Sequence, residues 1–550
     1  MGSAVAPLRI GAFRVMWVVS VLSAIGTFFQ SVAASWLMLE LTGSSTWVGL
    51  MVASSTLPLL FLALFTGALA DMFERARLML IAQLIMGGSA ATMAILAATD
   101  RITPGLLLGL GVMLGIGVAI NLPTWQALLP DLVPRGLVAS AVALQSAAFN
   151  TARAVGPALA GALVAAAGAA IAFGINAFTY LIAVAGLLVV RRDLEAPERA
   201  RTSFSSAIAL GVRFTRFTPD FGRLLMFTAL FAITSAVVQS VLPSHTTTLG
   251  GGAGLYGILL GCMGVGALVG AFTRAPVMRM LGSRATTATV AAFGSAGILL
   301  GLAPNPVVAA VAMLLAGYAW LMTLTDLRAI AQLISPAWIR GRTMSMYTLA
   351  FSGILPVGAI LAGVMADWVG TSSAIVGFSA CTIFLGVAAP VFRIPKLEDV
   401  ETPEFSESDF GPHHQDDTIG GGPVVILNHW EIDETDFEEF TRLMTQIRLV
   451  RLRTGAYRWR LFRDSRDPHR LVEFFVTGSW EEHLAQHRRI DDYSRVLLSS
   501  ARAFDRSGGP TTRHLIAIDV TNPPDFDDLI LTHDEMHRSD GSIPTFYTDG

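Results

Sequence analysis

Long apolar runs fill most of this 550-residue chain, and each is about as long as a membrane is thick. A helix that crosses the hydrocarbon layer needs about 20 mostly apolar residues, because inside lipid its backbone polar groups must be satisfied within the helix. Twelve such runs lie within the first 393 residues, approximately 14–40, 45–70, 78–98, 104–128, 137–166, 169–190, 221–245, 254–274, 285–303, 306–327, 342–367 and 371–392. The pattern predicts an all-α membrane protein with twelve spanning helices.

Basic residues gather in alternate loops of the predicted bundle. With the N-terminus in the cytosol, the external loops keep only Arg101. The internal loops then hold Arg75, Arg77, Arg135, Arg191, Arg192, Arg199, Arg201, Arg213, Arg216, Arg274, Arg279, Arg284, Arg340, Arg342, Arg393 and Lys396. Because cytoplasmic loops of membrane proteins carry such an excess, we expect a multi-pass inner-membrane protein with both termini in the cytosol.

The residues after 393 have the composition of a different kind of domain. Residues 1–393 have a net charge of +10, whereas residues 394–550 have a net charge of −13. A basic membrane part suits anionic lipids, and an acidic domain does not suit nucleic acid. The predicted order is a six-helix bundle at 1–193, a cytosolic loop at 194–220, a second six-helix bundle at 221–393, an acidic linker at 394–422, a folded domain at 423–520 and a disordered tail at 521–550.

The two predicted bundles resemble each other in sequence. The segment 67–76 aligns with 266–275 at six of ten positions, and the step from Pro134 to Gly161 equals the step from Pro336 to Gly363. Internal repeats are typical of transporters whose binding site lies at the midplane between two halves that rock against each other. The alternative is a likeness of composition between helices rich in Gly and Ala.

A motif with a gating role is expected between the second and third runs. It reads Gly67-x-x-x-Asp71-x-x-x-Arg75, followed by Arg77, and it resembles the signature loop of the major facilitator superfamily. A small glycine permits close helix contact, and an aspartate caps a neighbouring helix end or pairs with an arginine. The resemblance implies that these four residues form a gating loop. The chain departs from the family pattern at Met72, Glu74 and Ala76.

A longer stretch carries a more specific resemblance. Residues 121–135 and 150–161 are similar to the bacterial secretion-effector branch of that superfamily, the branch that contains the enterobactin exporter. The resemblance continues into the tail at 451–459 and 479–487. It implies export and the twelve-helix major facilitator fold. On the fifth run, Gly156, Pro157 and Gly161 resemble a shortened form of the superfamily's antiporter motif.

Arg153 is the strongest candidate for a substrate contact. It lies about 16 residues into the fifth run, or about 24 Å along a helix, well inside the hydrocarbon layer. A charge there is costly and marks a functional position by default. Asn150, Arg153 and Pro157 share one helix face, which can line a central cavity where Arg153 binds an anionic or phenolate group. The alternative is that Arg153 braces the bundle.

Other polar and aromatic residues within the runs are weaker candidates for the same cavity, since each is also an ordinary packing residue. They are Gln30, Trp36, Gln145, Gln239 and Trp320. Asp326 and Arg328, near the inner end of the tenth run, suit a local salt bridge or a position at the membrane interface or, alternatively, ion coupling. Glu40 and Asp367 end helices at the outer face, so solvated helix ends explain both unless the outer vestibule uses them.

The sequence after the linker predicts a small α+β domain. Strands are expected at 424–431, 457–462, 471–477 and 513–519, with helices at 434–453, 480–489 and 492–505. This β-α-β-β-α-β order is ferredoxin-like, and it resembles the small dimeric α+β barrels of the antibiotic-biosynthesis monooxygenase group, which implies self-association. His483 and His487 are one helical turn apart, but no third ligand is evident, so no metal and no cofactor are expected. The segment from Arg448 to Arg453 is expected on a solvated helix face, with docking on the inner loops of the bundle as the alternative.

These observations predict a secondary active transporter and not an enzyme. We expect it to export a small amphipathic molecule, such as a drug, siderophore or secondary metabolite, by alternating access. Antiport of a proton or another ion is the expected coupling, and membrane lipids are the expected surroundings. Two alternatives stay open: a lipid or lysolipid flippase on the same fold, and a transporter fused to an oxygenase-like enzymatic tail.

Overall fold

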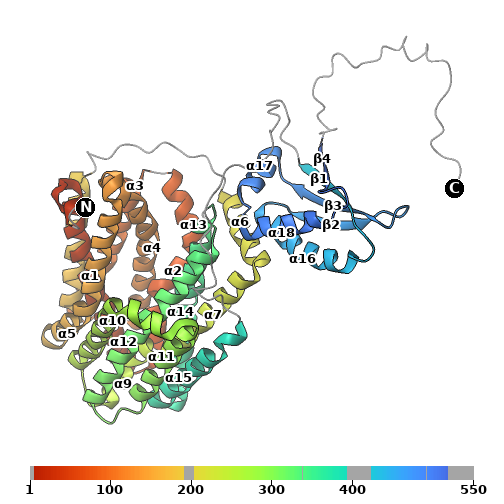
Figure 1. The fold of residues 1–550 in the computed structure, drawn as a ribbon. Coiled ribbons are helices and arrows are strands. Elements are labelled where there is room, and N and C mark those ends of the chain that lie inside the picture. The colour runs from red at the N-terminus through yellow and green to blue at the C-terminus, as the bar shows by residue number, and fades with distance from the viewer. Residues whose placement is uncertain are drawn as a thin grey trace. The chain divides into compact units, whose positions relative to one another are not determined.

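The computed structural model describes residues 5–72, 74–190, 204–336, 338–392, 423–490 and 492–517. The chain divides into two compact units, Met1–Thr402 and Pro403–Gly550. Figure 1 shows the first unit as a bundle of long helices and the second as a small sheet with helices beside it. The expected linker at 394–422 and the expected tail at 521–550 lie outside the described residues.

Helices account for almost all of the first unit. In the first part of the chain they are α1 (Gly11–Thr42), α2 (Ser45–Met72), α3 (Arg75–Ala98), α4 (Pro104–Leu128) and α5 (Val138–Val190). After residue 203 they are α6 (Phe204–Phe217), α7 (Pro219–Ser235), α8 (Val237–Ser240), α9 (Leu242–Thr248), α10 (Ala253–Leu281), α11 (Ala285–Gly301), α12 (Pro306–Ile334), α13 (Arg340–Thr348), α14 (Leu355–Val369) and α15 (Thr371–Ala388). Within the described residues, ten segments are long and apolar enough to cross a membrane.

The 53-residue helix α5 is two spanning helices joined at a sharp turn. Gly156 faces Phe28 of α1, and Gly26, two residues away on α1, faces Asn176. Positions 156 and 176 would be about 30 Å apart in a straight helix. They contact neighbouring residues of α1 because the chain reverses its direction at Gly168. The φ of Gly168 is 79°, a backbone conformation that glycine adopts readily.

Another of the ten segments also contains a turn. Helices α10 and α11 form one apolar stretch, Ala253–Gly301, and a short 3₁₀ turn at Gly282–Arg284 divides it. Two divided segments among the ten give the twelve spanning helices expected from the sequence. The all-α membrane architecture is therefore confirmed.

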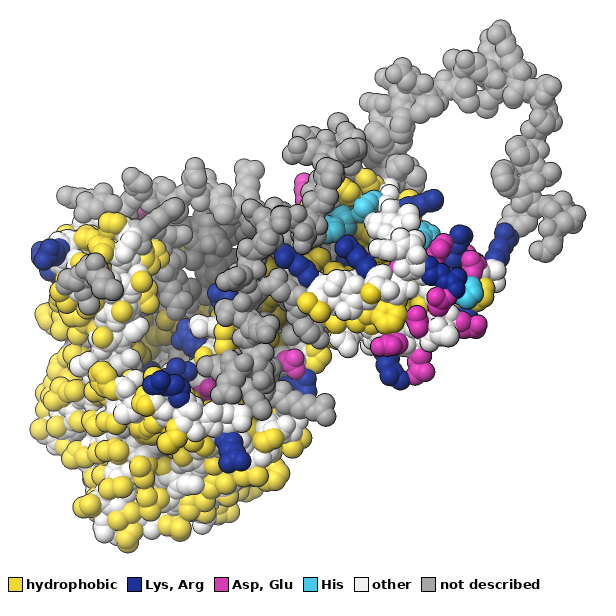
Figure 2. All heavy atoms as spheres, viewed as in Figure 1, with side chains coloured by type: hydrophobic (Ala, Val, Ile, Leu, Met, Phe, Trp, Pro, Cys, Tyr) yellow, Lys and Arg dark blue, Asp and Glu magenta, His cyan; other side chains and the backbone are white. Residues whose placement is uncertain are grey.

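Large apolar side chains cover the outside of the first unit. Phe178, Phe272 and Phe384 are 63%, 81% and 75% exposed, which is costly in water and favourable in lipid. The two units differ in their surfaces (Figure 2). The visible face of the bundle is mostly hydrophobic, whereas the visible face of the second unit carries many charged side chains. The bundle surface is that of a membrane protein.

The connection between the two halves contains a helix where the sequence predicts a loop. Helix α6 occupies Phe204–Phe217 within the predicted loop 194–220. Phe214 is 1% exposed, and its ring lies 5.7 Å from that of Phe221 and 6.4 Å from that of Trp338. The helix is held by packing against the bundle, a stabilisation that local sequence does not reveal.

The second unit is a four-stranded antiparallel sheet with helices on one face. Its elements are β1 (Val424–Glu431), α16 (Phe437–Thr454), β2 (Arg458–Arg463), β3 (Arg470–Thr477), α17 (Trp480–Arg488), α18 (Asp492–Ala503) and β4 (Thr511–Ile516), and the strand order is β2-β3-β1-β4. Alternate residues of β1 are buried, and Trp430 packs on Phe440 of α16. The predicted β-α-β-β-α-β order of elements is present, with α17 and α18 together taking the place of the second helix.

Candidate functional site

The two halves of the bundle meet closely at one end. A methyl group added to Gly257 of α10 would lie 2.6 Å from the carbonyl oxygen of Pro157 on α5, and one added to Gly264 would lie 2.6 Å from the carbonyl oxygen of Arg153. Gly161 lies against Gly257 in the same way. These glycines let two membrane helices touch backbone to backbone, which is how small residues act at such interfaces.

A second close contact joins α2 to α14 at the same end. A methyl group added to Gly49 would collide with the carbonyl oxygen of Ala359, and one added to Gly363 would collide with that of Ser45. Helix α2 begins at this end and α14 finishes there, beside the turn Gly43–Ser44. The two interfaces together close the bundle at the end that carries the 43–44 and 249–252 turns.

Arg153 lies where the closed part of the bundle begins. Its position on α5 is about 200° around the helix from Val155. Val155 and Leu159 are 49% and 51% exposed on the outer face, so Arg153 points inward. Along the Arg153 face, Val142 and Phe149 are 46% and 42% exposed, whereas Pro157 beyond Arg153 is buried. The uncovered part of this face therefore extends from Arg153 toward the start of α5.

The positive charge of Arg153 has no acidic partner among the residues that the structure describes. Its guanidinium lies 5.0 Å from the ring centre of Phe149, and that ring lies 6.1 Å from the ring of Phe28 on α1. Asn150, one turn earlier, is half-buried. A guanidinium on an aromatic face, beside an amide and inside an apolar bundle, is suited to hold an anionic or hydrogen-bond-accepting group.

Two of the predicted cavity residues lie in packed positions on α1. Gln30 is 5% exposed, donates to the Met93 sulfur and accepts from the Asn176 amide, so it lies in the core of the first half. Trp36 donates to Glu40 at 2.5 Å and stacks on Tyr256 of α10, with ring centres 6.1 Å apart. Trp36 therefore contributes to the contact between the halves at the closed end.

Gln145, Gln239 and Trp320, the other weaker candidates for the cavity, are spread across the bundle. The amide of Gln145 donates to Ser20 of α1. Gln239 is half-buried in the four-residue helix α8. Trp320 is at the centre of an aromatic cluster in the second half, with ring centres 5.4–5.8 Å from those of Phe231, Phe293 and Phe351. Gln145 and Trp320 have clear structural contacts of their own.

Asp326 and Arg328 have different surroundings in the structure and form no recorded ion pair with each other. Residues two apart on a helix point in nearly opposite directions. Asp326 is 5% exposed and accepts a 2.6 Å hydrogen bond from Thr286 of α11, whereas Arg328 is exposed. At the residue before Asp326, Arg274 of α10 donates a hydrogen bond to the Thr325 hydroxyl. Asp326 thus belongs to a junction of α10, α11 and α12 within the second half.

The predicted gating loop is at the turn between α2 and α3. Gly67 and Asp71 lie in the final turns of α2, and Arg75 begins α3. The side chains of these three residues lie outside the described part of the chain. Arg77 forms an exposed 2.7 Å ion pair with Glu74.

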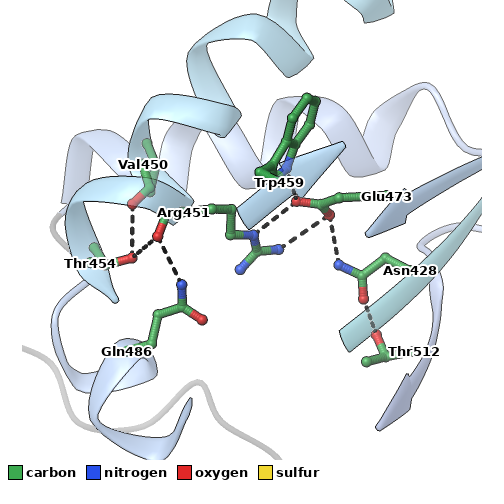
Figure 3. A network of polar contacts seen from close by, with 8 residues as sticks. All are labelled: Asn428, Val450, Arg451, Thr454, Trp459, Glu473, Gln486 and Thr512. Carbon is green, nitrogen blue, oxygen red and sulfur yellow. Dashed lines mark hydrogen bonds and ion pairs between the residues drawn. The ribbon is translucent and has the colours of Figure 1, made fainter. Parts of the chain in front are cut away.

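A buried carboxylate ties together all four strands of the second unit (Figure 3). Glu473 of β3 is 0% exposed and accepts from Arg451 of α16 at 3.0 Å, from Trp459 of β2 at 3.0 Å and from Asn428 of β1 at 2.6 Å. Asn428 in turn accepts from Thr512 of β4. Burial alone raises the pKa of Glu473, but the Arg451 charge and these hydrogen bonds outweigh it, so the pKa is lowered. Arg451, expected on a solvated face, is 9% exposed.

Replacing Glu473 with glutamine is expected to destabilise the second unit by about 3–5 kcal/mol, because it leaves the Arg451 charge buried without a counter-charge. Pulse proteolysis of the full chain in urea, scored on fragments of the second unit, measures this change. The matched control is Glu438→Gln, which breaks an exposed ion pair with Arg442 and is expected to cost less than about 1 kcal/mol. Equal losses in the two variants would contradict the assignment.

Three imidazoles meet where α17 packs on β4. The Nε2 atom of His483 lies 3.0 Å from Nε2 of His514 and 3.2 Å from Nε2 of His487. His514 is the residue that sequence reasoning missed, since strand register alone brings it beside α17. Within the described residues, no group of three acidic, histidine or cysteine side chains is arranged to hold a metal ion. Burial, and then the two neighbouring imidazoles, lower the pKa of His483 to about 3.

This low pKa predicts that acid destabilises the second unit. The folded value of about 3 lies below the ordinary 6.5, so the unfolded chain binds more protons between these limits. Stability is expected to be level above pH 6.5 and to fall below it, by up to about 1.4 kcal/mol per pH unit. Urea pulse proteolysis of the full chain from pH 8 to pH 5 checks this. His483→Leu should flatten the profile, and an unchanged slope in that variant would refute the explanation.

The model of the family described as transmembrane secretion effector matches residues 2–522. The chain belongs to this family. The match extends through the second unit, so the predicted resemblance to the secretion-effector branch of the major facilitator superfamily is confirmed.

Curated relatives of this secretion effector are transporters. The multidrug efflux pump Tap of Mycolicibacterium fortuitum is 27% identical over 387 residues, which are 68% of this chain and 94% of the relative. The staphyloferrin A transporter of Staphylococcus aureus is 24% identical, covering 63% of this chain and 88% of the relative. The enterobactin exporter EntS of Salmonella typhimurium is 26% identical, and the match covers 64% of this chain and 85% of the relative. With the family match, these relatives support a transporter function for the chain.

Solved structures agree with this fold. The nucleoside transporter NupG has a TM-score of 0.55 at 14% identity, covering 70% of this chain and 99% of that one. A second structure is that of a bacterial homologue of the human lysosomal transporter Spinster, in an inward-facing and unoccupied conformation. It has a TM-score of 0.53 at 17% identity, and the match covers 73% of this chain and 100% of the homologue. At these identities the likeness establishes the major facilitator fold alone.

Proposed function

We propose that this chain is a secondary active exporter that works by alternating access, and that Arg153 contacts the substrate. One observation carries the proposal: an arginine with no described acidic partner faces inward where the uncovered part of α5 meets the closed part of the bundle. The geometry suits a solute that carries an anionic or phenolate group on an apolar body. The relatives named for drugs and siderophores support this class of substrate.

We further propose that the closed end faces the periplasm and that both termini are cytosolic. The positive-inside pattern supports this orientation, since Arg101 is then the only basic residue in the external loops. In that orientation the structure is closed on the periplasmic side, and a substrate would reach Arg153 from the cytosol. Ion antiport is the proposed driving reaction, and Asp71 is the proposed gating residue.

Uptake into inverted inner-membrane vesicles tests this function. Vesicles that contain the protein should accumulate a catecholate siderophore or an amphipathic dye when a proton gradient is present, and dissipating the gradient should stop accumulation. Asp71→Asn should slow uptake strongly. Uptake of neither solute above that of empty vesicles would reject the proposal.

Self-association through the second unit is also proposed. The sheet face away from the helices is partly uncovered: Phe462 and Leu515 are each 52% exposed, and Phe462 lies beside Phe474 with ring centres 6.2 Å apart. A second copy of the chain is the proposed occupant. Cysteine cross-linking at position 462 should yield dimers, and its absence at micromolar protein in detergent would contradict the proposal.

A further inference from the structure

The carboxylate of Asp367, near the end of α14, binds the first turn of α2. One oxygen accepts from the backbone N–H of Ser45 at 2.7 Å. The other accepts from the backbone N–H of Thr46 at 3.0 Å and from the hydroxyls of Ser44 and Thr46 at 2.6 Å each. These groups are the unpaired donors of a helix start, where a negative charge is favoured. Asp367 thus acts as an N-terminal cap supplied by a different helix.

This cap joins the two halves of the bundle. Helix α2 belongs to the first half and α14 to the second, and the cap sits beside the glycine contact between Gly363 and Ser45. Ser45 also donates to Ser244 of α9, again from the second half. When the halves separate at this end, all four hydrogen bonds to Asp367 must break together.

Three other acidic side chains of the bundle have their recorded partners within their own half. Glu40 accepts from Trp36 of its own helix, and Asp326 accepts from Thr286 within the same half. Asp220 pairs with Arg223, three residues along the same helix. Unlike Glu40, Asp220 and Asp326, Asp367 accepts hydrogen bonds from the opposite half of the bundle.

We propose that Asp367 is the latch that holds this end of the transporter closed, and that a proton on its carboxyl group releases the latch. A neutral carboxylic acid loses most of its acceptor strength and its attraction to the helix start, so proton binding and closure exclude each other. By reciprocity, acid on this side favours the open state, and closure expels the proton. Asp367 is exposed, so solvent protons reach it directly. The inference rests on the proposed alternating-access function.

Few other charges bear on this latch. The described side chains of α2, and all of α8 and α15, which pack against α14, carry no charged residue. Asp220 and Arg223 of α7 pair with each other at the start of that helix. Helix α9, which touches α2, contributes His245, whose ring contacts the Leu300 carbonyl and Thr248. Helix α1 contributes Glu40. These two groups are the competing explanations for any pH response, and variants separate them.

Distances between spin labels across the closed end test the proposal. In a chain lacking Cys262 and Cys381, cysteines at Arg101 and Val307 place one label on each half at this end. In nanodiscs the wild-type latch should give mostly the short distance at pH 8, and the long-distance population should increase several-fold by pH 5. Asp367→Asn should give a raised long-distance population at both pH values.

Control variants keep the test decisive. Glu40→Gln and His245→Gln should retain the wild-type pH response, and Asp367→Glu should retain a response with a shifted midpoint. An Asp367→Asn variant that closes at pH 8 and responds to pH like the wild type overturns the latch. Vesicle uptake measured on the same variants distinguishes the two proposals, because wild-type uptake without an Asp367 effect rejects only the latch.

Discussion

Replacing Arg153 with methionine is expected to reduce substrate export by about 10- to 100-fold. A hydrogen bond to a charged group contributes about 1.5–3 kcal/mol, and methionine keeps the apolar stem while removing the cation. Export rates from inverted vesicles at sub-saturating substrate measure the loss. Arg153→Lys keeps the charge but not the planar fork of donors, so it should retain part of the activity.

A matched control separates this effect from general damage. Arg279 is exposed near the end of α10 and is expected to tolerate the same change to methionine without loss of export. The Arg153 variant should also remain monodisperse, because its side chain makes no described ion pair. Full export by Arg153→Met would show that Arg153 does not bind substrate.

Replacing Gly257 with valine is expected to stop export by preventing closure of the bundle. Even a methyl group at this position would lie 2.6 Å from both the Pro157 carbonyl oxygen and the Gly161 Cα atom, and backbone cannot move aside cheaply. Overpacking costs about 1–3 kcal/mol or more, so the ratio of closed to open states should fall by about 5- to 150-fold. The label pair at positions 101 and 307 should report a longer distance.

The same helix offers a control for this variant. A methyl group at Gly254 would lie 3.7 Å from the Ala165 side chain, an ordinary contact, so Gly254→Ala should export normally. If Gly257→Val exported normally as well, the α5–α10 contact would not be part of the transport cycle.

The twelve spans could be predicted because length and apolarity alone decide whether a helix crosses a membrane. Even the reversal near Gly168 was visible as a break between the runs 137–166 and 169–190. Helix α6 was missed because packing of Phe214 against Phe221 and Trp338 stabilises it, and those partners are distant in sequence or separated by a turn.

The site was less predictable than the fold, since its partners come from distant helices. From the sequence, Asp367 is indistinguishable from an ordinary solvated helix end. Its hydrogen-bond partners at the start of α2 are 321–323 residues away in sequence, so only the structure reveals them. Arg451 belongs to a run of basic residues, and only the register of β3 reveals that Glu473 faces it. His514 joins His483 through the pairing of β4 with β1. Arg153 was the exception, because a charge inside an apolar run is conspicuous by itself.

Access to the Arg153 region from each side of the membrane tests the central claim most directly. A cysteine at Asn150, in a chain lacking Cys262 and Cys381, can be exposed to a membrane-impermeant thiol reagent in inverted and in right-side-out vesicles. Alternating access predicts labelling from both sides, with the slower rate from the side that is closed in this structure. Labelling from one side only, even after prolonged exposure, would contradict a transport passage between the halves.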